Sequence, residues 1–135
     1  MEIKVQYLEG VKFEASARGN RLICDQPAEN AGTDAGMTPP ELLLASLGTC
    51  AGYYAVEYLK TRSLPTAGLE VKVTAEKALH PARLESFRIH VTAPGIAGHH
   101  VAGIERAVKQ CLIHNTLLNT PQVETVIETA AAARA

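Results

Sequence analysis

The chain has 135 residues, of which 47% are apolar, enough for one domain with a core and too few for two. Its formal net charge is −1, from 13 basic and 14 acidic residues that are spread along the chain, so it has no basic patch for nucleic acid. The first residues lack the features of a signal peptide, and no apolar stretch approaches the ~20 residues of a membrane span. We therefore expect a single domain over residues 1–135 that works in the cytoplasm, with no nucleic-acid or membrane partner.

The first 25 residues alternate between apolar and polar side chains over 3–7, 11–17 and 22–24. The pairs Glu9-Gly10 and Gly19-Asn20 separate these runs, and glycine supplies the positive φ that tight hairpin turns need. The pattern predicts a three-stranded meander. A polar loop with two glycines and a proline follows over 26–37, and loops of this length are often functional.

A long helix is predicted from about Pro39 to Ser63. Thr38 can cap it, Pro39 suits its first position, and Glu41 completes a T-x-x-E capping box. One face of this helix is apolar and carries Leu43, Leu47, Cys50 and Tyr54. At about 37 Å the helix would be longer than a compact domain of this size can cover. We therefore expect a second copy of the chain to bury part of it, in a homodimer.

The remaining patterns predict two strands, a second helix and a last strand. Residues 69–75 and 87–91 alternate and read as a strand pair joined near Pro81. A helix should run from about Val101 to Leu118, a short strand should cover 123–129, and residues 130–135 should fray. The order is βββαββαβ, which predicts an α+β fold with a mainly antiparallel sheet and two principal helices.

Three cysteines, an odd number without a CxxC motif, fit neither a secreted disulfide scaffold nor a zinc site. Cys50 and Cys111 each fall on the inward face of a predicted helix. A peroxidase needs one activated thiolate and a second thiol that captures the sulfenic acid, and this pair could supply both. Cys50 lies too far from the start of its own helix for the helix dipole to help, so we expect a cation to activate it, with Arg18 as the first candidate.

Simpler interpretations remain open for each of these residues. The cysteines could be core residues and Arg18 an ordinary charge of a hairpin turn. Glu41 has a structural role in its capping box and lies about 13 Å from Cys50 along one helix. Cys24 reads as structural. His114 could assist proton transfer or be solvated, and His99-His100 lacks a third ligand for a metal.

Three segments resemble the OsmC/Ohr family, the osmotically inducible and organic hydroperoxide resistance proteins. They are Asp25-x-Pro27 with its glycine-containing loop, GMTPPELLLASLGTC ending at Cys50, and ERAVKQCLIHNTL around Cys111. The resemblance implies an intertwined homodimer that reduces organic hydroperoxides at interface sites, binds no cofactor and is re-reduced by an external dithiol such as a lipoylated protein. It also implies that Cys50 is the peroxidatic cysteine, Cys111 the resolving one and Arg18 the activating arginine, held by a glutamate.

The helix start departs from the family pattern. The peroxidase branches carry Asn-Pro-Glu there, whereas this chain has Thr38-Pro39-Pro40-Glu41, so Pro40 takes the place of the glutamate and Glu41 follows one residue later. That resembles the general OsmC-like branch. It supports an alternative function, a non-enzymatic OsmC-like dimer that binds a small apolar or acyl ligand. A cross-chain contact, with Arg18 or Glu41 of one chain near Cys50 of the other, is the expected form of a working site.

Overall fold

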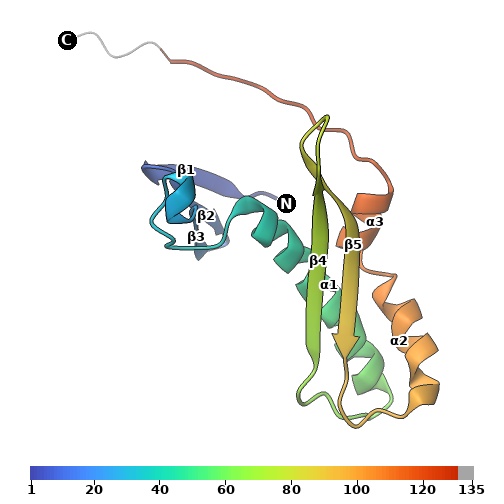
Figure 1. Ribbon diagram of the computed structural model, residues 1–135. Helices are drawn as coiled ribbons and strands as arrows, with labels where there is room; N and C mark the ends of the chain where they lie inside the picture. The colour runs from blue at the N-terminus through green and yellow to red at the C-terminus, as the bar shows by residue number, and fades with distance from the viewer. Residues whose placement is uncertain (131–135) are drawn as a thin grey trace.

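The computed structural model describes residues 1–130, and the tail predicted to fray, residues 130–135, lies outside them except for its first residue. Two parts are visible in Figure 1. A small three-stranded sheet stands at one end of the long helix α1, and a larger body combines α1, a two-stranded sheet and the later helices. The order of the first six elements is the predicted one, and the antiparallel α+β architecture is confirmed.

The N-terminal meander contains β1 (Lys4–Glu9), β2 (Lys12–Ala17) and β3 (Asn20–Cys24), paired in antiparallel order. Its register places Val5 opposite Ala15 and Tyr7 opposite Phe13, so one face is apolar. The other face carries polar residues, including an ion pair between Arg21 and Glu14 with 3.0 Å between Nη1 and Oε1. The predicted meander is confirmed.

The loop after β3 is folded around Asp25, which is buried. Its carboxylate accepts hydrogen bonds from the backbone N–H groups of Gln26, Thr33 and Ala35 and from the Thr33 hydroxyl, at 2.7–3.1 Å. Close backbone approach explains Gly32, because a Cβ there would overlap the Gln26 carbonyl group. These contacts connect the end of the meander to the start of α1.

Helix α1 (Pro39–Thr61) begins where the sequence predicts and ends two residues earlier than predicted. The capping box is formed. The Glu41 N–H donates to Thr38 Oγ1 at 3.4 Å, and the Thr38 N–H donates to Glu41 Oε1 at 2.9 Å.

The larger sheet is the hairpin of β4 (Glu70–Ala78) and β5 (Arg83–Thr92). Val71 lies opposite Val91, and Val73 opposite Ile89. These side chains are half-buried against the helices, while their polar neighbours along each strand are exposed. Pro81 lies in the connecting turn, as predicted.

The last third of the chain differs from the prediction in two ways. The predicted helix over 101–118 is interrupted at 109–111 and forms α2 (Val101–Val108) and α3 (Leu112–Leu118), preceded by the 3-10 turn η2 (Gly98–His100). The predicted strand over 123–129 is wrong for the single chain, because that segment pairs with no strand of residues 1–130. The segment runs away from the body (Figure 1) and exposes its apolar side chains Val123, Val126 and Ile127.

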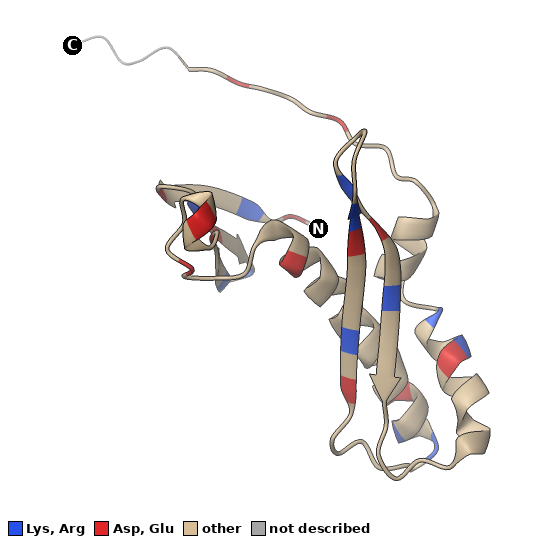
Figure 2. Ribbon diagram, in the orientation of Figure 1, with Lys and Arg blue, Asp and Glu red and all other residues tan. Residues whose placement is uncertain are grey.

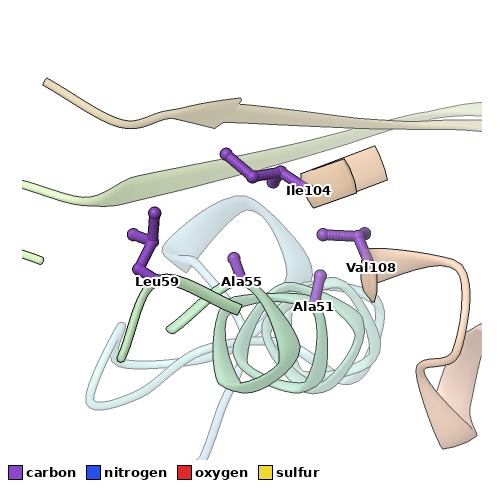
Figure 3. Close-up of a cluster of buried hydrophobic side chains, with 5 residues drawn as sticks. All are labelled: Ala51, Ala55, Leu59, Ile104 and Val108. Atoms are coloured by element: carbon purple, nitrogen blue, oxygen red, sulfur yellow. The ribbon is translucent and has the colours of Figure 1, made fainter. Parts of the chain in front are cut away.

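The core lies where α2 packs across the second half of α1. Figure 3 shows Ala51, Ala55 and Leu59 of α1 facing Ile104 and Val108 of α2. Small side chains on α1 allow α2 to approach closely. Gly103 serves the same approach, because a Cβ there would overlap the ring of Tyr58. This packing fixes the position of the segment that follows α2.

Candidate functional site

Cys50 lies in the middle of α1, one turn after the buried Leu47 and beside the buried Ala51. The sulfur is half-buried and the thiol is free. It lies at the edge of the face that α2 covers, where the chain emerges from α2 and begins α3. The helix therefore presents Cys50 to the 109–111 interruption, which contains the second cysteine.

Cys111 is completely buried, with 0% of its surface exposed, and its thiol is also free. It occupies the N-cap position of α3, and its Sγ accepts a hydrogen bond from the His114 N–H at 3.4 Å. The Cys111 and Cys50 side chains lie close enough that each changes the pKa of the other. The two cysteines that the sequence places 61 residues apart are thus in contact.

The surroundings move the two pKa values in opposite directions. Burial raises the pKa of Cys50, but hydrogen bonds from the Cys111 thiol and from the N–H groups of Ile113 and Leu112 outweigh it, so the pKa lies below its ordinary value. The pKa of Cys111 is raised by burial and by its hydrogen bond to Cys50. Of the two thiols, Cys50 is therefore the one that loses its proton more readily.

The backbone N–H groups of Ile113 and Leu112, in the first turn of α3, add to the effect of Cys111 in lowering the pKa of Cys50. Backbone N–H groups at a helix start are unpaired within the helix and favour a negative charge. Sequence reasoning missed them because it treated 101–118 as one helix, and cysteine is not a common capping residue. The one feature of the sequence that coincides with the break between α2 and α3 is a run of polar residues and a cysteine at 109–111, and such a run is equally compatible with a continuous helix.

Arg18 and Glu41 do not meet Cys50 within one chain. Arg18 is exposed in the β2–β3 turn, on the sheet that stands apart from the body (Figure 1). Glu41 is engaged in its capping box, nine residues before Cys50 and on the opposite side of α1. The hydrogen bonds with Thr38 hold the pKa of Glu41 below its ordinary value. Their predicted roles require a second copy of the chain.

The apolar side chains that share the face of α1 with Cys50 line two separate pockets. Leu43 and Leu47 line a cavity against β5 and α3, whereas Tyr54 lines a shallower, mixed pocket with Leu112 and Asn115. Tyr53 is largely exposed. Between Glu41 and Glu57 the sequence of α1 contains no charged residue, and the coils of α1 that follow the red residue near its start are tan in Figure 2, so no charge of α1 itself lies near Cys50.

The other candidate residues lie away from this pair. Cys24 is half-buried on β3, opposite Phe13. His99 and His100 stack with 4.1 Å between ring centroids, and within residues 1–130 no three metal-binding side chains are grouped to hold an ion. None of the helices in this part of the chain combines the length and apolar character that crossing a bilayer requires.

The fold is shared with several solved structures. An osmotic stress induced and detoxification response protein from Psychrobacter arcticus aligns with a TM-score of 0.77 and 22% identity, over 84% of this chain and 85% of that one. An OsmC-like protein from Mycoplasma pneumoniae aligns with a TM-score of 0.73 and 21% identity, over 88% of this chain and 87% of that one. An organic hydroperoxide resistance protein from Elizabethkingia anophelis aligns with a TM-score of 0.63 and 17% identity, over 89% of this chain and 90% of that one.

Sequence identities this low show a common fold and do not show a common activity or substrate. Comparison with curated protein sequences gave no match. The family model of the OsmC-like proteins matches residues 32–126. This range contains the second half of the loop that folds around Asp25, all of α1, and both Cys50 and Cys111. On this match over most of its length, the chain belongs to the OsmC-like protein family.

Proposed function

We propose that the protein is a thiol peroxidase that reduces organic hydroperoxides through Cys50, with Cys111 as the resolving cysteine. The contact between the two free thiols carries the proposal, because it joins a lowered pKa at Cys50 to a raised pKa at Cys111. A nucleophilic thiolate and a protonated neighbour are what the two halves of this reaction need. Relatives of the same fold include organic hydroperoxide resistance proteins.

The steps balance as follows. The Cys50 thiolate attacks the terminal oxygen of the hydroperoxide, the O–O bond breaks, and the alkoxide takes a proton to leave as an alcohol. Cys50 is then a sulfenic acid. The Cys111 sulfur attacks it, a disulfide forms, and water leaves. An external dithiol, for example a lipoylated protein, returns both cysteines to thiols.

Cumene hydroperoxide consumption with dithiothreitol as reductant tests the assignment. Cys50→Ser should abolish turnover, while Cys24→Ser, the control at the third cysteine, should leave it intact. Mass spectrometry after one equivalent of peroxide should find a Cys50–Cys111 disulfide in the unsubstituted protein. Undiminished turnover in Cys50→Ser would refute the peroxidatic role, and a lasting sulfenic acid without the bridge would refute the resolving role.

The active form is proposed to be a homodimer with a composite site. The meander exposes an apolar face, and α1 is about 35 Å long yet covered by its own chain on one side only. A partner chain would cover both surfaces and could bring its Arg18 or Glu41 to Cys50. Mixing Cys50→Ser chains with Arg18→Ala chains tests this, because activity recovered from two inactive parents requires an arginine that acts across the dimer.

A non-enzymatic dimer that binds a small apolar or acyl ligand is the second candidate. Pro40 at the position of the family's glutamate and the absence of Arg18 from the Cys50 environment within one chain favour it. The pH dependence of Cys50 alkylation separates the two functions. A pKa well below the ~8.5 of a free thiol supports the peroxidase, and an unshifted pKa supports the binder.

A further inference from the structure

Two cysteine sulfurs meet where α3 packs against α1. Cys50 comes from the middle of α1, Cys111 is the N-cap of α3, and both thiols are free. They lie close enough that each changes the pKa of the other. Within residues 1–130 no third histidine, cysteine or carboxylate joins them in a group that could hold a metal ion. Among these residues the pair is a donor set of two sulfurs.

The number and type of these donors decide which cation they suit. Zinc is bound by three or four protein ligands, and calcium and magnesium take oxygen ligands. Thiolates are soft ligands that favour copper(I). Copper(I) has a filled d shell and forms stable complexes with two sulfur ligands alone. His114 follows Cys111 by one turn but is not grouped with the two thiols, so a zinc site lacks its third ligand.

The geometry of the pair suits a metal bridge. A metal–sulfur bond of about 2.3 Å places two bridged sulfurs up to about 4.6 Å apart, whereas a disulfide requires about 2.05 Å. Neighbouring thiols therefore need less movement to share an ion than to form a disulfide. A pocket lined by Tyr54, Gln110 and Leu112 lies beside the pair, because these residues are one turn after Cys50 and on either side of Cys111. This pocket gives the ion a route to the sulfurs.

The surroundings also suit the charge of the complex. A copper(I) ion held by two thiolates carries a net charge of −1. The N–H groups of Leu112 and Ile113 favour a negative charge at Cys50. Cys111 is 0% exposed, so water does not compete for the ion on that side.

We propose that Cys50 and Cys111 bind one copper(I) ion per chain between their two sulfurs. Two S–H bonds are replaced by two Cu–S bonds, both protons leave to solvent, and no atom is oxidised or reduced. The ion is a competing ligand and not a resident cofactor. Because it occupies the Cys50 sulfur, it also blocks attack on a hydroperoxide, and this consequence rests on the proposed function. The binding itself does not.

Anaerobic titration of the reduced protein with copper(I), in competition with the chelator bicinchoninate, measures stoichiometry and affinity. We expect one ion per chain in the unsubstituted protein and in Cys24→Ser, the control at the third cysteine. Cys50→Ser and Cys111→Ser should each weaken binding by at least about a hundredfold, since loss of a group that only supports a metal ligand already costs about 10–100-fold. From pH 6 to pH 7 the affinity should rise at least about tenfold, because the raised pKa of Cys111 leaves its proton to be displaced at both values.

A measurement on the unsubstituted protein guards against a folding defect in the serine variants. One equivalent of copper(I) should slow alkylation of Cys50 by iodoacetamide and leave that of Cys24 unchanged, while the same concentration of zinc(II) should protect neither. X-ray absorption should find two sulfur neighbours at copper. Unchanged affinity in Cys50→Ser, loss of the ion in Cys24→Ser, equal protection by zinc(II), or three or more ligands at copper would overturn the proposal. No peroxide is present, so failed turnover with intact copper binding counts against the peroxidase alone.

Discussion

The meander and the body are stabilised in different ways. The body has a buried core, in which side chains of α1 and α2 exclude water from one another (Figure 3). The meander has none. Its apolar face is open, with Tyr7 62% exposed, and among residues 1–38 the one fully buried side chain is a carboxylate, Asp25.

This difference separates a part of the chain with a core of its own from a part whose apolar face the described chain leaves uncovered. Strand pairing with one uncovered apolar face gives little stability in water, and contiguous apolar patches mark interaction surfaces. The cysteine pair belongs to the self-sufficient body, whereas Arg18 belongs to the open meander. Assembly would therefore control the arginine and leave the thiol contact unchanged.

The largest effect is expected in the core of the body. Leu59 is 0% exposed, so Leu59→Ala should lower the free energy of unfolding by about 2–5 kcal/mol. Leu22 in the meander is 43% exposed, and Leu22→Ala should cost under about 1 kcal/mol in the monomer. Urea unfolding at low protein concentration measures both. Equal losses would show that the meander has a core of its own.

The next effect concerns assembly. Tyr7→Lys places a charge on the apolar face of β1 and should raise the dimer dissociation constant at least tenfold, since burial of an unpaired charge is costly. Gln6→Lys is the control, because Gln6 points to the opposite face, across from Glu14. Sedimentation at micromolar concentration measures both variants. An unchanged dissociation constant in Tyr7→Lys would place the interface elsewhere.

Sequence periodicity and turn residues predicted the elements whose start, end or neighbouring strand is encoded locally. The capping box at Thr38 and Glu41, the meander and the β4–β5 pair all follow from local patterns. The strand expected at 123–129 did not form, because alternation shows that a segment suits a sheet and does not provide a neighbouring strand.

The candidate site was predictable in part. Two inward cysteines on separate helices were visible in the sequence, and the structure brings Cys50 and Cys111 into contact. The break before α3 was not visible, because Lys109-Gln110-Cys111 contains neither glycine nor proline. The effect of the Leu112 and Ile113 N–H groups on the pKa of Cys50 depends on that break, so it could not be predicted from local pattern.

Asp25 supplies a smaller, local effect. Asp25→Asn replaces a carboxylate oxygen with an amide NH₂ that cannot accept hydrogen bonds, so some of the N–H donors of the loop lose their partner. Amide exchange at Thr33 and Ala35 should accelerate at least tenfold, while exchange in α2 stays unchanged. Asp34→Asn, an exposed change in the same loop, is the control. Slow exchange in Asp25→Asn would show that the loop is held by other contacts.

The ionisation of Asp25 should also make the stability of this loop depend on pH. The hydrogen bonds from Thr33, Ala35 and Gln26 hold the pKa of Asp25 well below its ordinary value. A carboxyl group whose pKa is lower in the folded state stabilises that state above its unfolded pKa of about 3.9, and the stabilisation is lost as pH falls further. The protection factor of the Thr33 amide, its exchange rate relative to that of an unfolded chain at the same pH, should therefore hold at pH 5 and fall below about pH 4.

The smallest effect is expected where α2 begins. Tyr58 Oη and His100 Nδ1 share a hydrogen bond of 2.9 Å, the His99 ring stacks on His100, and the Arg62 guanidinium lies 3.7 Å from the centre of the Tyr58 ring. Burial lowers the pKa of His100, and the charges of His99 and Arg62 lower it further. The folded state therefore favours neutral His100.

Because the pKa of His100 is lower in the folded state, its contribution is fully present above the unfolded value of about 6.5 and declines as pH falls below it. The urea midpoint should fall between pH 7 and pH 5 in the unsubstituted protein and fall less in His100→Gln, which cannot become charged. His90→Gln, an exposed histidine on β5, should follow the unsubstituted protein. If the urea midpoints of all three proteins changed with pH in the same way, the charge on His100 would not affect the docking of α2 on α1. The position of Cys111 beside Cys50 would then also be independent of that charge.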